Sequence, residues 1–320
     1  MKTLKHTLIA CCIAALPLAT PIVAQAAAPM AKTQAPGYYR TMLGDYEVTA
    51  LSDGTVNLPM DKLLKGLDKK AIDKALAYHY LSSPVETSVN GFLINTGSKL
   101  ILIDTGAGVF FGPTLGKLVA NLKAAGYQPD QVDEIYITHM HPDHVGGLVS
   151  NGQRVFPNAV VRAEQADADY WLSADNLAKA SDDSKAFFQG AMASLKPYID
   201  AGKFQPFNGN ADLAPGIRAV ITHGHTPGHC VYEVESKGQK MLVIGDLIHV
   251  GSVQFDRPKV AIDFDSDSKT AIAERLKEFD DIAKSGEIAA AAHLSFPGLG
   301  HMQKRGSGYE WIPLNYQSAP

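Results

Sequence analysis

The chain has 320 residues, of which 46% are hydrophobic and 19% are charged. This composition excludes a disordered or fibrous protein and provides ample apolar side chains for a core. The formal net charge of -4 comes from 29 basic and 33 acidic residues that form no long runs, so we expect no nucleic-acid partner.

The N-terminus has the pattern of a secretory signal peptide. Lys2 and Lys5 precede an apolar run over residues 8–23, and a small-x-small cleavage site follows at 24–26. Prolines interrupt the run, which lacks the ~20 uninterrupted apolar residues of a membrane span. We therefore expect export and cleavage, with no stable membrane anchor.

The sequence predicts three segments: a signal peptide over 1–26, an extended N-terminal leader over 27–45 and one globular domain over 46–320. Cleavage would release a secreted or periplasmic protein. A lipoprotein-like box ends at Cys11, but almost no apolar stretch precedes it, and lipidation of Cys11 stays an open alternative. After cleavage Cys230 would be the sole cysteine, which excludes an internal disulfide.

Strand patterns dominate the first half of the predicted domain, and each is bounded by turn residues. The expected strands cover residues 46–52, 92–95, 99–104 and 134–138. Asp53 and Gly54 predict a turn after the first of them. Apolar residues at helical spacing predict a helix over 113–125.

The second half repeats this order, with a hairpin, a helix and a last strand. Its expected strands cover residues 230–235, 240–246 and 288–292, and the longer helices 184–198 and 268–284. Two strand-rich halves favour two sheets packed face to face, because each half alone would bury too little. With helices covering the outer faces, the fold class is α/β, a four-layer αββα sandwich.

The strongest functional signal is THMHPDH at 138–144, which directly follows a predicted strand. Imidazole and carboxylate are the ligands that zinc and similar metals prefer. On an extended segment His139 and His141 point the same way and can bind one ion. The turn at Pro142 then directs Asp143 and His144 towards a second ion.

Further ligands are expected at other strand ends, where a rigid sheet holds the loops. His229 precedes a strand, and Asp246 and His293 each follow one. The sequence predicts that His229 joins the first ion, that His293 joins the second, and that Asp246 bridges them. Three protein ligands per ion leave coordination open for water, as in a catalytic site.

The sequence resembles the metallo-β-lactamase superfamily of binuclear hydrolases, and within it the secreted methyl parathion hydrolase family with its lactonase and arylesterase relatives. The superfamily resemblance rests on HxHxDH at 139–144, DTG at 104–106, TPGH at 226–229, GD at 245–246 and His293. The narrower one rests on APGYYR at 35–40, ITHMHPDHVGG at 137–147, FFQGAMASL at 187–195 and HLSFPGLGH at 293–301.

The resemblance implies the metallo-β-lactamase fold, two divalent metal ions with zinc as the expected metal, and a homodimer. Members that cleave β-lactams mostly lack an aspartate at the place of Asp246, which makes penicillin cleavage the less favoured activity. Phe111, Trp171 and Phe187 match positions where relatives carry aromatic residues around the leaving group; a core role is the alternative.

We expect a metal-bridging hydroxide as the nucleophile, with Asp143 and Asp246 as the catalytic residues: Asp143 carries the proton to the leaving group, and Asp246 bridges the ions. Asp104 either orients a ligand histidine or caps its own turn. His249 follows Asp246 closely and is expected at the substrate pocket or behind a ligand. Ile262 and Phe264 are expected to line the same pocket, whereas His223, His225 and His301 are interpreted as structural.

No cluster of Lys or Arg adjoins these motifs, so the expected substrate is a small neutral lactone or aryl ester, with phosphotriesters as a secondary possibility. A glutathione thioesterase would share the ligands but calls for basic residues near the C-terminus, where Lys304 and Arg305 form the only pair. A non-catalytic metal-binding periplasmic protein is the alternative from another class. A diiron redox enzyme is disfavoured, because its usual glutamate ligand and flavin domain are not visible.

Overall fold

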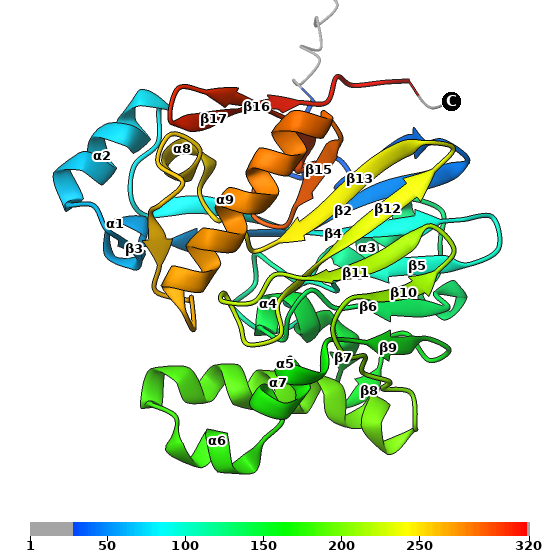
Figure 1. Ribbon diagram of the computed structural model, residues 1–320. Helices are drawn as coiled ribbons and strands as arrows, with labels where there is room; N and C mark the ends of the chain where they lie inside the picture. Colours follow the sequence, from blue (N-terminus) through cyan, green and yellow to red (C-terminus); the bar gives the residue numbers. More distant parts are fainter. Residues whose placement is uncertain (1–27, 319–320) are drawn as a thin grey trace, which may run out of the picture. The chain divides into compact units, whose positions relative to one another are not determined.

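Two mixed β-sheets lie face to face in the computed structural model, which describes residues 28–318 (Figure 1). The first sheet has the order β1 (Tyr38–Leu43), β2 (Tyr46–Leu58), β4 (Val85–Asn95), β5 (Leu100–Ile103), β6 (Glu134–Tyr136) and β9 (Val160–Arg162). The second has the order β10 (Ala211–Ala214), β11 (Ile217–Ile221), β12 (Cys230–Ser236), β13 (Gln239–Gly245), β15 (Ile288–Ala291), β16 (Leu299–Arg305) and β17 (Gly308–Pro313).

Helices and short strand pairs complete the described part of the chain. The helices are α1 (Met60–Leu63), α2 (Lys69–Tyr78), α3 (Leu118–Ala124), α4 (Pro142–Val145), α5 (Gln165–Trp171), α6 (Ala174–Lys179), α7 (Asp182–Asp200), α8 (Gly251–Gln254) and α9 (Ser268–Ser285), with 3-10 turns Pro129–Gln131 and Gly146–Leu148. The short pairs are β3 (Leu64–Lys65) with β14 (Ala261–Ile262), and β7 (Val149–Ser150) with β8 (Gln153–Arg154). Within residues 28–318, no helix has the length and apolarity to cross a bilayer.

The layers follow from strands that are apolar on both faces. Ile101 and Ile103 of β5 pack between the sheets, in a cluster with Val243 of β13. Leu102 points the other way and packs against the helices α3, α5 and α7. On the far side, Phe279 of α9 packs against the outer face of the second sheet. The predicted four-layer α/β sandwich is confirmed.

Two predicted local features are wrong, and Asp53 explains both. The strand β2 continues to Leu58 through a bulge, and no turn forms at Asp53 and Gly54. The buried Asp53 carboxylate accepts hydrogen bonds from the backbone N–H groups of Ala107, Gly116 and Leu118, at 2.9, 2.9 and 3.0 Å. Because these bonds fix residues 113–117 as a loop, α3 begins only at Leu118.

The start of the folded unit also differs from the prediction. Residues 38–43, assigned from the sequence to the leader over 27–45, form β1 and pair with β2. The compact unit begins at Pro36, and residues 28–35 form no helix or strand. The signal peptide predicted over 1–26, with Cys11, lies outside the described residues.

Candidate metal centre

The polar residues of the site follow the carboxyl ends of strands. β5 and β6 run parallel, and so do β13 and β15, so the exits within each pair share one edge. β6 leads into His139 and His141, and Pro142 is the first residue of α4, which carries Asp143 and His144. Asp246 directly follows β13, and His293 comes two residues after β15.

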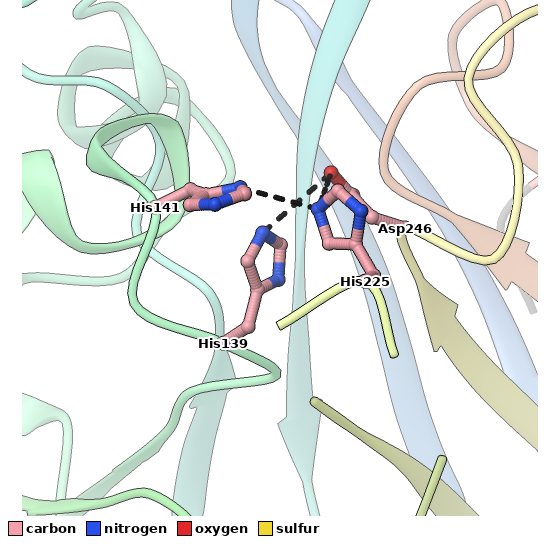
Figure 2. A group of neighbouring side chains, drawn as sticks. All are labelled: His139, His141, His225 and Asp246. Atoms are coloured by element: carbon pink, nitrogen blue, oxygen red, sulfur yellow. Dashed lines mark hydrogen bonds and ion pairs between the residues drawn. The ribbon is translucent and has the colours of Figure 1, made fainter. Parts of the chain in front are cut away.

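The first cluster unites His139, His141, His225 and Asp246, all buried (Figure 2). His141 Nδ1 lies 3.1 Å from His225 Nε2, and Asp246 Oδ2 lies 3.3 Å from His225 Nε2 and 3.6 Å from His139 Nε2. Donors on a tetrahedral zinc ion, with bonds of about 2.0–2.1 Å, are separated by about 3.3 Å. The spacing of this cluster therefore fits one ion.

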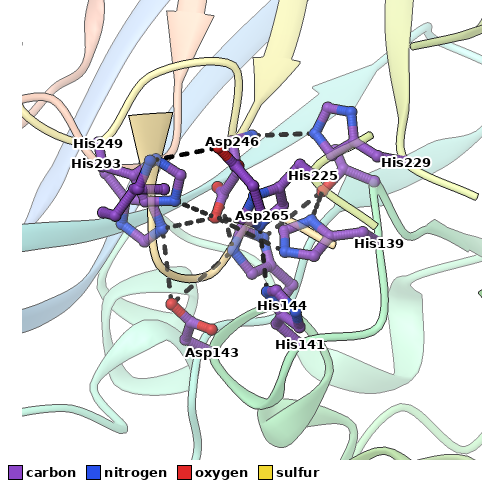
Figure 3. Close-up of polar contacts among 12 residues, drawn as sticks. His139, His141, Asp143, His144, His225, His229, Asp246, His249, Asp265 and His293 are labelled. Atoms are coloured by element: carbon purple, nitrogen blue, oxygen red, sulfur yellow. Dashed lines mark hydrogen bonds and ion pairs between the residues drawn. The ribbon is translucent and has the colours of Figure 1, made fainter. Parts of the chain in front are cut away.

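The second cluster contains Asp143, His144 and His293, and Asp246 lies between the two (Figure 3). His144 Nε2 is 3.2 Å from Asp246 Oδ1 and 3.8 Å from Asp143 Oδ2. His293 Nε2 is 3.5 Å from Asp143 Oδ2 and 3.2 Å from Asp246 Oδ2. One carboxylate thus contacts ligands of both clusters.

The buried polar atoms of these clusters fit a pair of cations. His139 Nε2, His144 Nε2 and Asp246 Oδ1 are buried without a hydrogen-bond partner, which is costly unless something binds them. On the opposite ring nitrogens, His144 Nδ1 donates to Asp104 and His293 Nδ1 donates to the Ser88 carbonyl, both at 2.9 Å. Anchoring one nitrogen and freeing the other is typical of metal-binding histidines.

The electrostatics point the same way. Burial and the neighbouring histidines hold the pKa of His139 and of His141 well below the ordinary value. Burial disfavours ionisation of Asp246, but the surrounding histidines hold its pKa well below the usual range. Neutral His139 and His141 beside an ionised carboxylate have the protonation states that a divalent metal requires. For His144, His225 and His293, burial disfavours the charged form, but the neighbouring carboxylates outweigh burial and raise the pKa above the ordinary value.

The structure corrects one predicted ligand: His225, interpreted as structural from the sequence, occupies the place expected for His229. Both ring nitrogens of His229 are already used. Its Nδ1 donates to the Thr222 carbonyl at 3.1 Å, and its Nε2 accepts from the backbone N–H of Asp246 at 3.1 Å. His229 therefore holds the start of the Asp246 loop. The sequence signal was present, since HTPGH at 225–229 offers two histidines.

Asp104 lies directly behind the second cluster. Its backbone adopts a φ of 58°, and its carboxylate accepts from His144 Nδ1 at 2.9 Å and from the Thr138 hydroxyl at 2.8 Å. The other carboxylate oxygen accepts from the Thr138 N–H at 2.9 Å. This geometry matches the expected orienting role rather than a turn cap alone.

Asp167 was not singled out from the sequence, yet it joins two ligand loops. Its buried carboxylate accepts from the backbone N–H of Met140, between His139 and His141, at 2.7 Å. It also accepts from the N–H of Gly228 at 2.6 Å. Burial raises the pKa of Asp167 to about 6. An aspartate in a helix pattern gives no sign of this role.

Aromatic side chains border the first cluster. The rings of Trp171 and Phe187 each lie 5.1 Å from the His141 ring. Phe187 is also 6.4 Å from both Phe111 and Phe264. Phe111 is half-exposed, whereas Trp171 is buried with an unpartnered indole N–H. These four aromatic residues, which we term the aromatic wall, lie together beside His141; their contact with a leaving group stays a prediction.

Two other predicted pocket residues are placed differently. Ile262 is fully buried and belongs to an apolar cluster with Met60 and Leu64, because β14 pairs with β3 at this position; Phe264 packs against the border of this cluster. His249 lies among the ligands: its Nε2 is 3.1 Å from Asp246 Oδ2, and its ring stacks on His293 at 5.2 Å. Ile262 is thus a core residue, and His249 lies at the border between the metal centre and the wall.

Comparison with known proteins identifies the family. The model of the metallo-β-lactamase superfamily matches residues 84–281, which is more than half of the chain. The chain belongs to this superfamily, and it is a metal-dependent hydrolase with a binuclear site for divalent metal.

Solved structures and curated relatives place lactonases among its neighbours. The hydrolase AbOPH is 41% identical with a TM-score of 0.85, over 89% of this chain and 100% of AbOPH. AidC, a dizinc quorum-quenching lactonase solved with N-hexanoyl-L-homoserine as product, is 28% identical with a TM-score of 0.82, over 88% of this chain and 99% of AidC. An N-acyl homoserine lactonase of Bacillus thuringiensis is 25% identical over 233 residues, or 66% of this chain and 83% of that protein.

Proposed function

We propose that the protein hydrolyses small neutral lactones or aryl esters with two zinc ions. The observation that carries this proposal is the contact between His141 of the first cluster and the aromatic wall, at ring distances of 5.1 Å. Within residues 28–318, Asp143 and Asp246 form ion pairs with histidines and with no Lys or Arg. Such a site favours a neutral substrate, because these contacts include no Lys or Arg side chain that could bind a charged group.

His139, His141 and His225 would hold one ion, Asp143, His144 and His293 the other, and Asp246 both. Ions so bound would lower the pKa of water, supply the nucleophile at neutral pH and polarise the substrate oxygen. The geometry thereby supports the nucleophile between the clusters that the sequence suggested.

Asp143 is the residue proposed to move the proton. Its side chain is 21% exposed, whereas that of Asp246 is 3% exposed, so Asp143 can reach a molecule in the pocket. In ester hydrolysis the water oxygen bonds to the carbonyl carbon and the bond to the leaving oxygen breaks. The Asp143 carboxylate would take the proton lost by water and deliver it to the departing alkoxide or phenolate.

The lactonases among the relatives support a lactone, and the wall of aromatic rings supports an aryl leaving group. Neutral phosphotriesters form the second candidate class, since they combine the same features with a phosphoryl oxygen for the metal. We further propose that the enzyme acts outside the cytoplasm after removal of residues 1–26, and as a homodimer.

A substrate panel with controlled metal content tests the proposal. The purified protein would be assayed with an acyl lactone, an aryl ester, a neutral phosphotriester, a glutathione thioester and a penicillin, before and after chelation and after zinc return. We expect the lactone or the aryl ester to give the highest kcat/KM, with loss on chelation and recovery with zinc. Preference for the thioester, or no turnover of any ester by fully zinc-loaded protein, would contradict the proposal.

A further inference from the structure

We propose that Asp265 is a positioning residue that orients His225 towards the first ion and fastens that ligand to the segment carrying Phe264. This inference rests on the metal centre and not on the identity of the substrate. Asp265 lies on the loop between β14 and α9, 40 residues away from His225 in the chain.

The contact itself is buried. The His225 Nδ1–H donates to Asp265 Oδ1 at 3.0 Å, and their side chains are 2% and 0% exposed (Figure 3). The other ring nitrogen, Nε2, faces His141 and Asp246 in the first cluster. A carboxylate on the outer nitrogen fixes the ring orientation and the tautomer, and it makes the inner nitrogen a better ligand.

The loop that carries Asp265 is itself firmly held. Asp265 Oδ2 accepts from the backbone N–H of Ile262 at 3.2 Å. The backbone N–H of Ser266 donates to the His225 carbonyl at 2.9 Å. Directly before β14, the buried Arg275 donates to the carbonyls of Pro258 and Val260 at 3.0 and 2.8 Å. The carboxylate is therefore presented in one orientation.

The second cluster contains the same kind of contact between a carboxylate and a ligand histidine. Asp104 accepts from His144 Nδ1 at 2.9 Å, in the arrangement that Asp265 forms with His225. Each cluster thus has one carboxylate behind one histidine. The Asp265 loop also bears a side chain of the aromatic wall: Phe264 lies 6.4 Å from Phe187 and 5.9 Å from His249. The first ion and the pocket therefore share a structural support.

Zinc extraction from Asp265→Ala and Asp265→Asn tests the inference. The zinc-loaded proteins would be titrated with a chromogenic chelator, which reports affinity without any substrate. We expect Asp265→Ala to bind one of its two ions about 10- to 100-fold more weakly than the wild type. Asp265→Asn should lie between them, because its amide oxygen still accepts from His225.

Asp267→Asn is the matched control. Asp267 lies two residues further on, and its side chain caps α9 by accepting from the N–H groups of Lys269 and Thr270. Its backbone N–H donates to the Gly224 carbonyl at 2.8 Å, a contact that Asp267→Asn keeps. Its variant should keep both zinc affinities. Cobalt-substituted protein gives a second readout: the absorption bands should shift in Asp265→Asn and stay unchanged in Asp267→Asn. Wild-type zinc affinity and cobalt bands in both Asp265 variants would overturn the inference, as would equal weakening in Asp267→Asn.

Discussion

The two halves of the metal centre are built differently. The N-terminal half takes four ligands, His139, His141, Asp143 and His144, from one strand exit and the short helix that follows. The C-terminal half takes His225, Asp246 and His293 from three separate loops. In the N-terminal half, the ligands are close in sequence, and the local backbone geometry orients their side chains. In the second half, each ligand depends on distant contacts that fix its loop.

This difference explains the error at His229. Local spacing suffices to assign residues 139–144, but it cannot decide which histidine of HTPGH faces the metal. The decision rests on tertiary partners: Asp265 holds the outer nitrogen of His225, while Thr222 and the Asp246 backbone occupy His229. Where ligands lie on separate loops, the tertiary contacts of their outer ring nitrogens therefore decide which side chain faces the metal.

The largest effect on activity is expected from a substitution in the N-terminal half of the metal centre. His139→Ala removes a nitrogen ligand and should lower kcat/KM for every substrate at least about 1000-fold, since the ions contribute several kcal/mol to the transition state. Steady-state assays of the zinc-supplemented variant would measure this. His301→Ala, which alters a histidine outside the centre, serves as the control. Retention of more than a tenth of the activity in His139→Ala would refute the ligand assignment.

The paired variants His225→Ala and His229→Ala test the C-terminal half of the metal centre. His225→Ala should lose zinc from one of the two positions, as measured by elemental analysis. His229→Ala should keep both ions more nearly intact but unfold more easily, by about 1–3 kcal/mol, because the Asp246 N–H loses its buried acceptor. The reverse pattern, with zinc lost in His229→Ala alone, would restore the assignment first made from the sequence.

Asp167 joins the two halves, and its raised pKa gives a pH-dependent effect. The folded pKa of about 6 exceeds the ordinary 3.8, so the folded state binds the proton more tightly. The resulting stability is present below pH 3.8 and disappears as pH rises to about 6. Metal-free Asp167→Asn lacks this titration, so it should gain stability relative to metal-free wild type by about 3 kcal/mol between pH 4 and pH 7.

Urea unfolding of both metal-free proteins across this range measures that gain. Taking the difference between the two proteins removes the titrations that they share. A difference in free energy of unfolding that does not change with pH would show that Asp167 is ionised normally in the fold.

The smallest effect is expected at the aromatic wall. Trp171→Phe should change the ratio of kcat/KM values for the lactone and the aryl ester by about tenfold, because pocket contacts discriminate modestly between neutral substrates. The neighbouring Phe188, buried on α7, provides the control. Phe188→Leu should lower stability and leave the ratio unchanged. Equal losses for both substrates in Trp171→Phe would mark Trp171 as a core residue.

The fold was predictable where the sequence pattern is local. The hairpin β4–β5, the long helices α7 and α9, and the strands leading into His139 and Asp246 follow from apolar spacing and turn residues. The four layers follow from the need to cover strands that are apolar on both faces. The role of Asp53 could not be predicted from local pattern, because its inward carboxylate orders a loop that comes more than 50 residues later in the chain.

Within the site, the metal ligands other than His225 were predictable, whereas Asp167 and Asp265 were not. Residues 139–144 combine metal-binding side chains at a spacing that structure alone rarely requires. Asp167 and Asp265 act on backbone N–H groups and on the outer nitrogen of a histidine, contacts that leave no pattern in sequence. Ile262 was wrongly expected in the pocket. It lies two residues from Phe264 of the aromatic wall in the sequence, but its side chain packs in the apolar cluster with Met60 and Leu64.

The most direct test of the binuclear centre is a crystal structure of the zinc-loaded protein with anomalous data at the zinc edge. We predict two anomalous peaks, one among His139, His141 and His225 and one among Asp143, His144 and His293, with Asp246 in contact with both. A single peak, or a peak bound by His229 with His225 turned away, would contradict it.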